Sequence, residues 1–239
     1  SNNVSGLSIN QTSGVLLEHA GSPFSPLALG ANPQSVAADP SGRYLYVVNQ
    51  GSNNVSAFSI ASGTGILTAV GLPVSTGVGP GPSAVTVEPS GRFAYVVNAT
   101  PNQNQVSQFS IQPNGALAAT GVPLSLAPTA APQAIVGDPT GQFLYVANNG
   151  TNNISAYLIT AADGLLTGIG STSSATLGTA PVSLSVDPLG QFLYVANETS
   201  HNVSAFAIDQ ATGALAEHAD SPFDLGPAAL PQSIAVDLS

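Results

Sequence analysis

Short apolar runs alternate with clusters of Gly, Pro, Asn and Ser along the whole chain. The runs are five to seven residues long and rich in Val, Ile, Phe and Tyr, and none shows the spacing of an amphipathic helix. This combination is typical of short strands joined by tight turns. The pattern therefore predicts an all-β protein.

The runs recur in sets of four, in a repeat of 49 or 50 residues that begins at 33, 82, 132, 181 and 231. In the first repeat, "SVAAD" is followed by "YLYVVN", by "NVSAFSI" at 54–60, and by "GILTAV". Four strands in a repeat of this length predict the blade of a β-propeller, made of antiparallel strands. The first run is the smallest and most apolar, so we expect it to form the innermost strand, beside the axis.

The most regular part of the repeat is "DPSGRYLYVVN" at 39–49, which returns in closely related form at 88–98, 138–148 and 187–197. Asp39-Pro40-Ser41-Gly42 predicts a turn in which the carboxylate accepts backbone N–H groups. The following "YLYVVN" is apolar on both faces of a strand. We therefore expect every blade to pack against a neighbour on each side.

The fifth repeat is incomplete. The chain opens on the third run of a repeat, "NVSGLSI", and closes on a first run, "SIAVD". We expect one propeller domain over 1–239, in which 1–31 supplies the outer strands of the blade that 231–237 completes. Direct pairing of 233–237 with 3–9 would be parallel, unlike the rest of the blade. Three explanations stay open: a fragment of a longer propeller, a blade of three strands, or a strand supplied by another molecule.

Charge limits the possible partners. Only 6% of the 239 residues are charged, against roughly 25% in ordinary globular proteins. Arg43 and Arg92 are the only cations beside twelve carboxylates, too few to neutralise the phosphates of a nucleic acid. No apolar run approaches the ~18 residues of a membrane span, so membrane insertion is not expected. With no Cys and no Met, the chain fits an extracellular or cell-surface location.

Equivalent turn positions carry five carboxylates that could be oxygen ligands for calcium: Asp39, Glu88, Asp138, Asp187 and Asp237. We favour five separate turn caps, because equivalent positions in different blades diverge unless they face the axis. The histidines, His19, His201 and His218, fall on outer strands and a loop without zinc-ligand spacing. No G-x-S-x-G elbow occurs. The sequence thus predicts no catalytic residue, no metal and no cofactor.

The segments "GRYLYVVN", "GRFAYVVN" and "GQFLYVAN" resemble the YVTN-type repeats of the lactonase-like β-propellers. That family includes 6-phosphogluconolactonase-type proteins and secreted bacterial surface propellers, and its members usually close with seven blades. "GALAEHADSPF" at 213–223 is similar to phrases in the secreted members. A phosphosugar lactonase needs cations that converge on phosphate, whereas Arg43 and Arg92 occupy equivalent, divergent positions.

Three functions follow as hypotheses. The leading one is an extracellular, non-enzymatic structural or interaction protein that binds itself. This hypothesis includes self-assembly into filaments through the incomplete blade. The first alternative is a lactonase-type hydrolase with its active site at the mouth of the central channel, as the resemblance implies. The second alternative is a ligand- or glycan-binding propeller that uses the loops between strands.

Overall fold

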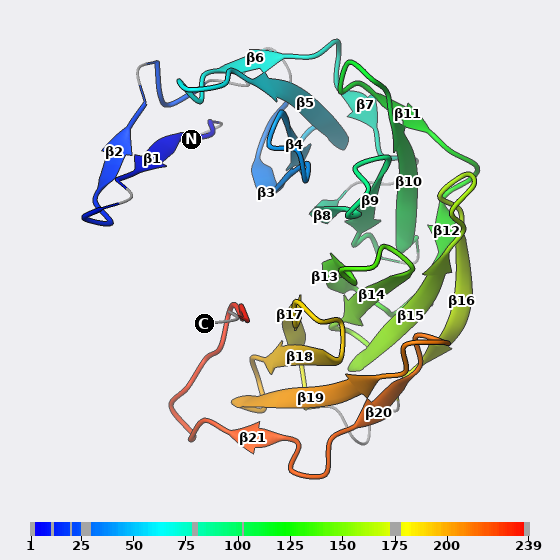
Figure 1. Cartoon of the computed structure of the whole chain (residues 1–239). Helices are drawn as coiled ribbons and strands as arrows, with labels where there is room; N and C mark the ends of the chain where they lie inside the picture. The colour runs from blue at the N-terminus through cyan, green and yellow to red at the C-terminus, as the bar shows by residue number, and fades with distance from the viewer. Residues whose placement is uncertain are drawn as a thin grey trace.

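The computed structural model describes residues 3–10, 12–19, 21–24, 30–77, 81–101, 103–172 and 178–236. Within these ranges the ordered elements are strands, β1 to β21, and no helix occurs. The strands form four blades that follow one another around an open arc, and a short N-terminal hairpin lies at one end of it (Figure 1). The predicted all-β propeller of antiparallel blades is confirmed.

Each blade contains four strands that pair in chain order, and three of the blades carry a short additional strand. The first blade consists of β3 (Pro33–Ala38), β4 (Tyr44–Asn49), β5 (Asn54–Ile60), β6 (Leu67–Ala69) and β7 (Val74–Ser75). The second consists of β8 (Pro82–Val87), β9 (Phe93–Asn98), β10 (Gln105–Ile111), β11 (Leu117–Ala119) and β12 (Leu124–Ser125). The third consists of β13 (Pro132–Gly137), β14 (Phe143–Asn148), β15 (Asn153–Ile159) and β16 (Leu166–Ser171). The fourth consists of β17 (Pro181–Val186), β18 (Phe192–Asn197), β19 (Asn202–Ile208), β20 (Leu215–Glu217) and β21 (Phe223–Asp224). The hairpin consists of β1 (Leu7–Ile9) and β2 (Leu16–Glu18).

The first strands of the blades, β3, β8, β13 and β17, line the inside of the arc (Figure 1). Their small side chains let neighbouring inner strands approach one another, as the sequence predicts for the innermost position. The hydrophobic cores lie between blades. Tyr46 and Val48 of the first blade pack with Ala94 and Val96 of the second, so alternate residues of each second strand face different neighbours. The expected packing on both faces is confirmed at these junctions.

The outer strand is shorter than the sequence predicts. In the first blade β6 ends at Ala69, and pairing with β5 resumes only at β7, after Pro73. The interruption contains Gly71, whose φ of 67° lies in the left-handed region, and Pro73, which has no N–H to donate to a ladder. The third blade has no proline there, and its outer strand β16 runs continuously over six residues with one register shift.

Residues 231–236 lie beside β17 on the inside of the arc (Figure 1). The backbone N–H of Ile234 donates to Ser183 Oγ (3.2 Å), and that of Val236 donates to Ser185 Oγ (3.2 Å). The first two inner strands make the equivalent contact, from Val85 N–H to a serine Oγ of β3 (3.4 Å). The segment 231–236 therefore holds the place of the first strand of a further blade, although it forms no ladder with the described residues.

The hairpin β1–β2 and segment 231–236 lie at opposite ends of the arc, with the open side of the ring between them (Figure 1). β1 pairs only with β2 in the part of the chain that the structure describes. That 1–31 and 231–237 contribute strands to one blade therefore stays a prediction.

Candidate functional site

The propeller has two rims with different chemistry. One rim carries the turns between first and second strands, and the other carries the loops between second and third strands together with the beginnings of the inner strands. The second strand that joins the rims is six residues long. At about 3.3 Å per residue, groups on opposite rims lie on the order of 20 Å apart, so they cannot act on one small substrate.

The carboxylate of Asp39 caps its turn on the first rim. Its Oδ1 accepts the backbone N–H groups of Arg43 (2.8 Å) and Tyr44 (2.6 Å), and Oδ2 accepts the hydroxyl of Ser41. Burial acts to raise the pKa of Asp39, but the hydrogen bonds from Ser41, Tyr44 and Arg43 outweigh it and hold the pKa below its usual value of 3.8. The ionised carboxylate is thus part of the turn.

The equivalent carboxylates of Glu88, Asp138 and Asp187 each cap their own turn. They accept the N–H groups of Phe93 (3.1 Å), Phe143 (2.7 Å) and Phe192 (2.6 Å), respectively. Asp237, the fifth candidate, lies outside the described residues. Among the residues that are described, no three His, Cys, Asp or Glu side chains come together as metal ligands. The structure therefore does not bring these calcium candidates to a common site.

The two arginines also lie on the first rim, in separate blades. The guanidinium of Arg43 stacks over the ring of Tyr44 at 5.2 Å from its centroid, and that of Arg92 stacks over Phe93 at 5.0 Å. Arg92 also donates to the carbonyl of Ala161 in the next blade (2.5 Å). Each arginine contacts residues around its own turn, and the two do not converge on a shared anion.

The histidines are likewise separate. His19 lies in the hairpin against Gly65, His201 contacts the carbonyl of Ala229 through Nδ1, and His218 meets the edge of the Phe192 ring. Their positions in three different environments give no shared catalytic or ligating set.

A buried asparagine ends each second strand at the second rim and fixes the loop that follows. Asn148 Nδ2 donates to Asn153 Oδ1 (2.9 Å) and to Ser155 Oγ (2.8 Å). Asn197 makes the same two bonds with Asn202 and Ser204. This role was not predicted, although the recurrence of Asn at the end of each "YVVN" or "YVAN" run was its signal.

Loops of the second rim border a pocket of about 480 Å³ between the second and third blades. Asn104 shapes its wall, because its buried side chain donates to the carbonyls of Ala127 (3.1 Å) and Pro128 (2.8 Å). Gln133, near the beginning of β13, is exposed and lines the pocket. The other lining residues are Ala99, Pro101, Pro128, Thr129 and Ala131. Such a surface suits a small, neutral, hydrogen-bonding ligand.

Glu198 is a carboxylate on the second rim. Its Oε1 accepts a hydrogen bond from Nε2 of Gln232 at 2.6 Å, where 231–236 runs beside the fourth blade. The residues that directly follow the other three second strands are Gln50, Ala99 and Asn149, so Glu198 is the one carboxylate at this position of the described blades. Sequence reasoning missed the pair because its members are 34 residues apart.

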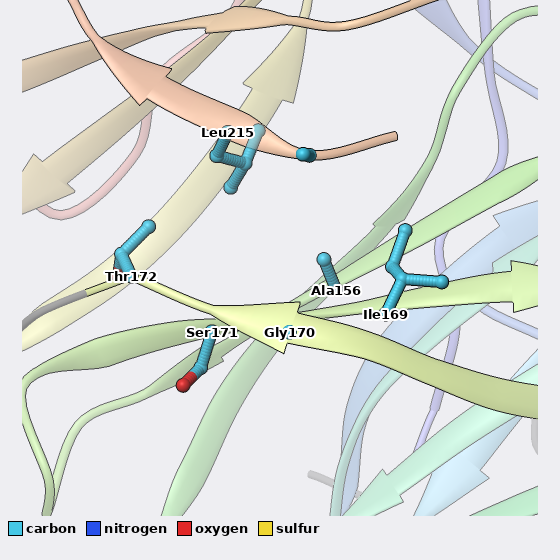
Figure 2. A pocket seen from close by; sticks show the side chains of 7 residues that line it. Ala156, Ile169, Gly170, Ser171, Thr172 and Leu215 are labelled. Carbon is cyan, nitrogen blue, oxygen red and sulfur yellow. The ribbon is translucent and has the colours of Figure 1, made fainter. Parts of the chain in front are cut away.

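A smaller pocket of about 120 Å³ lies away from both rims, between β15, β16 and β20 (Figure 2). Leu215 of β20 faces Ala156 and Ile169 across it, whereas Ser171 points to the opposite side of its strand. Gln108 holds the place of Ala156 in the second blade, where its Oε1 accepts the backbone N–H of Leu166 at 2.8 Å. The pocket thus arises from a small side chain at one junction and is lined by no ionisable group.

The model of the family described as "Lactonase, 7-bladed beta-propeller" matches residues 1–79 and 74–228. The chain belongs to this family. The resemblance of its repeats to lactonase-like propellers is thereby confirmed, and the fold agrees with it. No helix long and apolar enough to cross a membrane occurs in the described part of this family member.

Solved structures of similar fold include bacterial lactonases. A candidate 6-phosphogluconolactonase from Bacteroides uniformis superposes with a TM-score of 0.76 at 21% identity, over 94% of this chain and 70% of its own. A second, from Bacteroides fragilis, gives 0.75 at 20% identity, over 97% and 67%. The periplasmic gluconolactonase PpgL of Pseudomonas aeruginosa gives 0.68 at 26% identity, over 96% and 67%. The chain thus spans about two thirds of these structures. No curated protein sequence is similar enough to match.

Proposed function

We propose that the chain belongs to an exported propeller that hydrolyses a neutral sugar lactone at the second rim, with Glu198 as general base. The observation that carries this proposal is the Glu198–Gln232 hydrogen bond, in a chain of the lactonase family. The periplasmic location and gluconolactonase name of the Pseudomonas structure support export and a sugar lactone. This activity replaces a purely structural role as the leading hypothesis.

The chemistry requires one base and one water molecule. The Glu198 carboxylate accepts a proton from water while the water oxygen bonds to the lactone carbonyl carbon. The ring C–O bond then breaks, and the proton passes from Glu198 to the departing alkoxide, which leaves a hydroxy acid. Gln232 Nε2 holds Oε1 in place from the side of segment 231–236, so that the other carboxylate oxygen is free to face the water.

A neutral lactone fits better than a phosphorylated one. The only cations of the chain, Arg43 and Arg92, lie on the first rim, about a strand length from Glu198. A phosphate group at the second rim would meet carboxamides and a carboxylate without a cation to balance it. The pocket beside Gln133 offers amide and hydroxyl groups of the kind that bind sugar hydroxyls.

The proposal is tested by following acid release from glucono-lactone at constant pH, with spontaneous hydrolysis subtracted. Glu198→Gln keeps the shape of the side chain and removes the base, so we expect kcat to fall about a hundredfold or more. Glu217→Gln, on the outer strand β20, is the matched control and should leave kcat unchanged. The 6-phosphorylated lactone should be the poorer substrate. Equal rates for the wild type and Glu198→Gln would contradict the assignment.

A second candidate is self-association in a structural role outside the cell, with the chain as its own partner. The observation in its favour is the exposure of large apolar side chains at the N-terminal end of the arc, including Leu7, Ile9 and Leu16. Exposed apolar surface of this kind marks interaction sites. This role does not need Glu198, so the Glu198→Gln variant separates the two candidates.

A further inference from the structure

Neighbouring blades are joined by a contact that repeats along the arc. In the first three blades, a tyrosine of the second strand donates its hydroxyl to the carbonyl of a glycine in the turn before the outer strand of the next blade. The three pairs are Tyr46 with Gly115 (3.1 Å), Tyr95 with Gly164 (2.8 Å) and Tyr145 with Gly213 (3.0 Å). All three tyrosines are fully buried.

The same glycines accept an aromatic ring. A Cβ on Gly164 would collide with the ring of Phe93, and one on Gly213 would collide with Phe143. A leucine two residues after the glycine completes the contact, and Leu166 is only 8% exposed at such a junction. Each junction therefore has an aromatic half, made of two second-strand residues, and a glycine half, made of the turn glycine and this leucine.

Among the described residues, the aromatic half of the fourth blade faces no glycine half. Phe192 and Tyr194 occupy the positions of Phe143 and Tyr145, with their rings 6.4 Å apart, and both are partly exposed. The hydroxyl of Tyr194 donates to no carbonyl of the residues that the structure describes. Segment 231–236 covers only the inner end of this blade.

Within the described part of the chain, the glycine half of the N-terminal hairpin faces no aromatic half. Gly14 has the φ of Gly213, 70°, but a Cβ on Gly14 would meet no atom within 4 Å. Leu16, which corresponds to Leu166, is 58% exposed. The two unmatched halves thus lie at opposite ends of the same chain, separated by the open side of the arc (Figure 1).

We infer that Phe192 and Tyr194 of one copy bind Gly14 and Leu16 of a second copy, through the contact that already joins the blades within each chain. The inference names the surface for the self-association proposed above and rests on it. In the combined blade, 231–236 of one copy takes the first strand position, and β1 and β2 of the other take the third and fourth. The contact is head-to-tail, so each bound copy leaves one free half at either end.

The test uses sedimentation velocity over a range of protein concentrations. The wild type should associate progressively. Leu16→Asp, a change at a side chain that is exposed in the single chain, should weaken association by about a hundredfold, since it places a charge in an apolar contact. Leu72→Asp is the matched control, because Leu72 is 83% exposed and belongs to neither half. This control should associate as the wild type does.

Mixing of two variants identifies the surfaces that are in contact. Leu16→Asp blocks only the glycine half, and Tyr194→Asp blocks only the aromatic half, so each variant alone should be monomeric. Their mixture retains one working contact and should form a one-to-one dimer that grows no further. A wild type that is monomeric at every concentration would overturn both the self-association and this contact. Association that neither variant weakens would keep the self-association and overturn the contact.

Discussion

The second strands of the second and fourth blades carry nearly the same residues in different surroundings. Tyr95 of β9 is fully buried and bonded to the next blade, whereas Tyr194 of β18 is partly exposed at the end of the arc. The local strand is equally regular in both blades. The comparison shows that the repeat motif forms a strand in both settings, and we expect its contribution to stability to depend on whether a neighbouring blade supplies the other half of the junction.

We expect the largest effect on stability from removal of each of the two tyrosine rings. Tyr95→Ala should lower the free energy of unfolding by about 3–5 kcal/mol, the usual cost of truncating a buried aromatic side chain. Tyr194→Ala should cost about 1 kcal/mol or less, because no blade covers its outer side. Urea unfolding of both variants measures the difference. Equal losses would show that the motif contributes the same energy with or without a neighbour.

A smaller effect is expected where two complete junctions differ by one side chain. Gln108→Ala opens a cavity and leaves the N–H of Leu166 without its partner, so we expect a loss of about 2–3 kcal/mol. Ala156→Gln places the same side chain beside the pocket of Figure 2, opposite Leu215, and should raise stability by up to ~1 kcal/mol. Thermal unfolding of the two variants shows whether each change lowers or raises the stability. A loss in Ala156→Gln would mean that the pocket cannot accept the amide.

Acid should separate turn carboxylates from exposed ones. The folded-state pKa of Asp39 lies below 3.8, so its ionised form stabilises the fold above that pH, and the contribution is lost as pH falls through the folded pKa. Asp39→Asn should therefore lower stability at pH 7 and flatten the loss of stability below about pH 4. Glu18→Gln removes an exposed carboxylate on β2 as a control. Unfolding curves between pH 7 and pH 2 would contradict this account if both variants kept the wild-type slope.

The smallest expected difference isolates the junction hydrogen bond. Tyr145→Phe removes the hydroxyl that donates to Gly213 and should cost about 1 kcal/mol. Tyr194→Phe removes a hydroxyl without a described partner and should change stability by a few tenths at most. Chemical denaturation at several concentrations, below the onset of association, measures both.

Much of the fold was predictable because its signals are local. The third strand Asn54–Ile60 has the predicted bounds, and the alternation in "YLYVVN" correctly assigns Tyr46 and Val48 to one junction. The broken outer strand was not predicted, because the effect of Gly71 and Pro73 depends on how far β5 extends. At the candidate site, the loop asparagines had a visible signal, whereas the contact of Glu198 with Gln232 depends on the placement of segment 231–236. Such long-range pairs follow from the arrangement of the blades.

Hydrogen exchange at low and high protein concentration tests the central claim most directly, namely that the ends of the arc are complementary halves of a blade junction. At low concentration, amides of β9 and β14 should be strongly protected and those of β1 and β2 should exchange fast. At high concentration, protection should appear selectively in the hairpin around Gly14, whereas β18, which is already paired with β17 and β19, should be protected at both concentrations. Amide protection in the hairpin that does not depend on protein concentration, or concentration-dependent protection on other surfaces, would contradict the account.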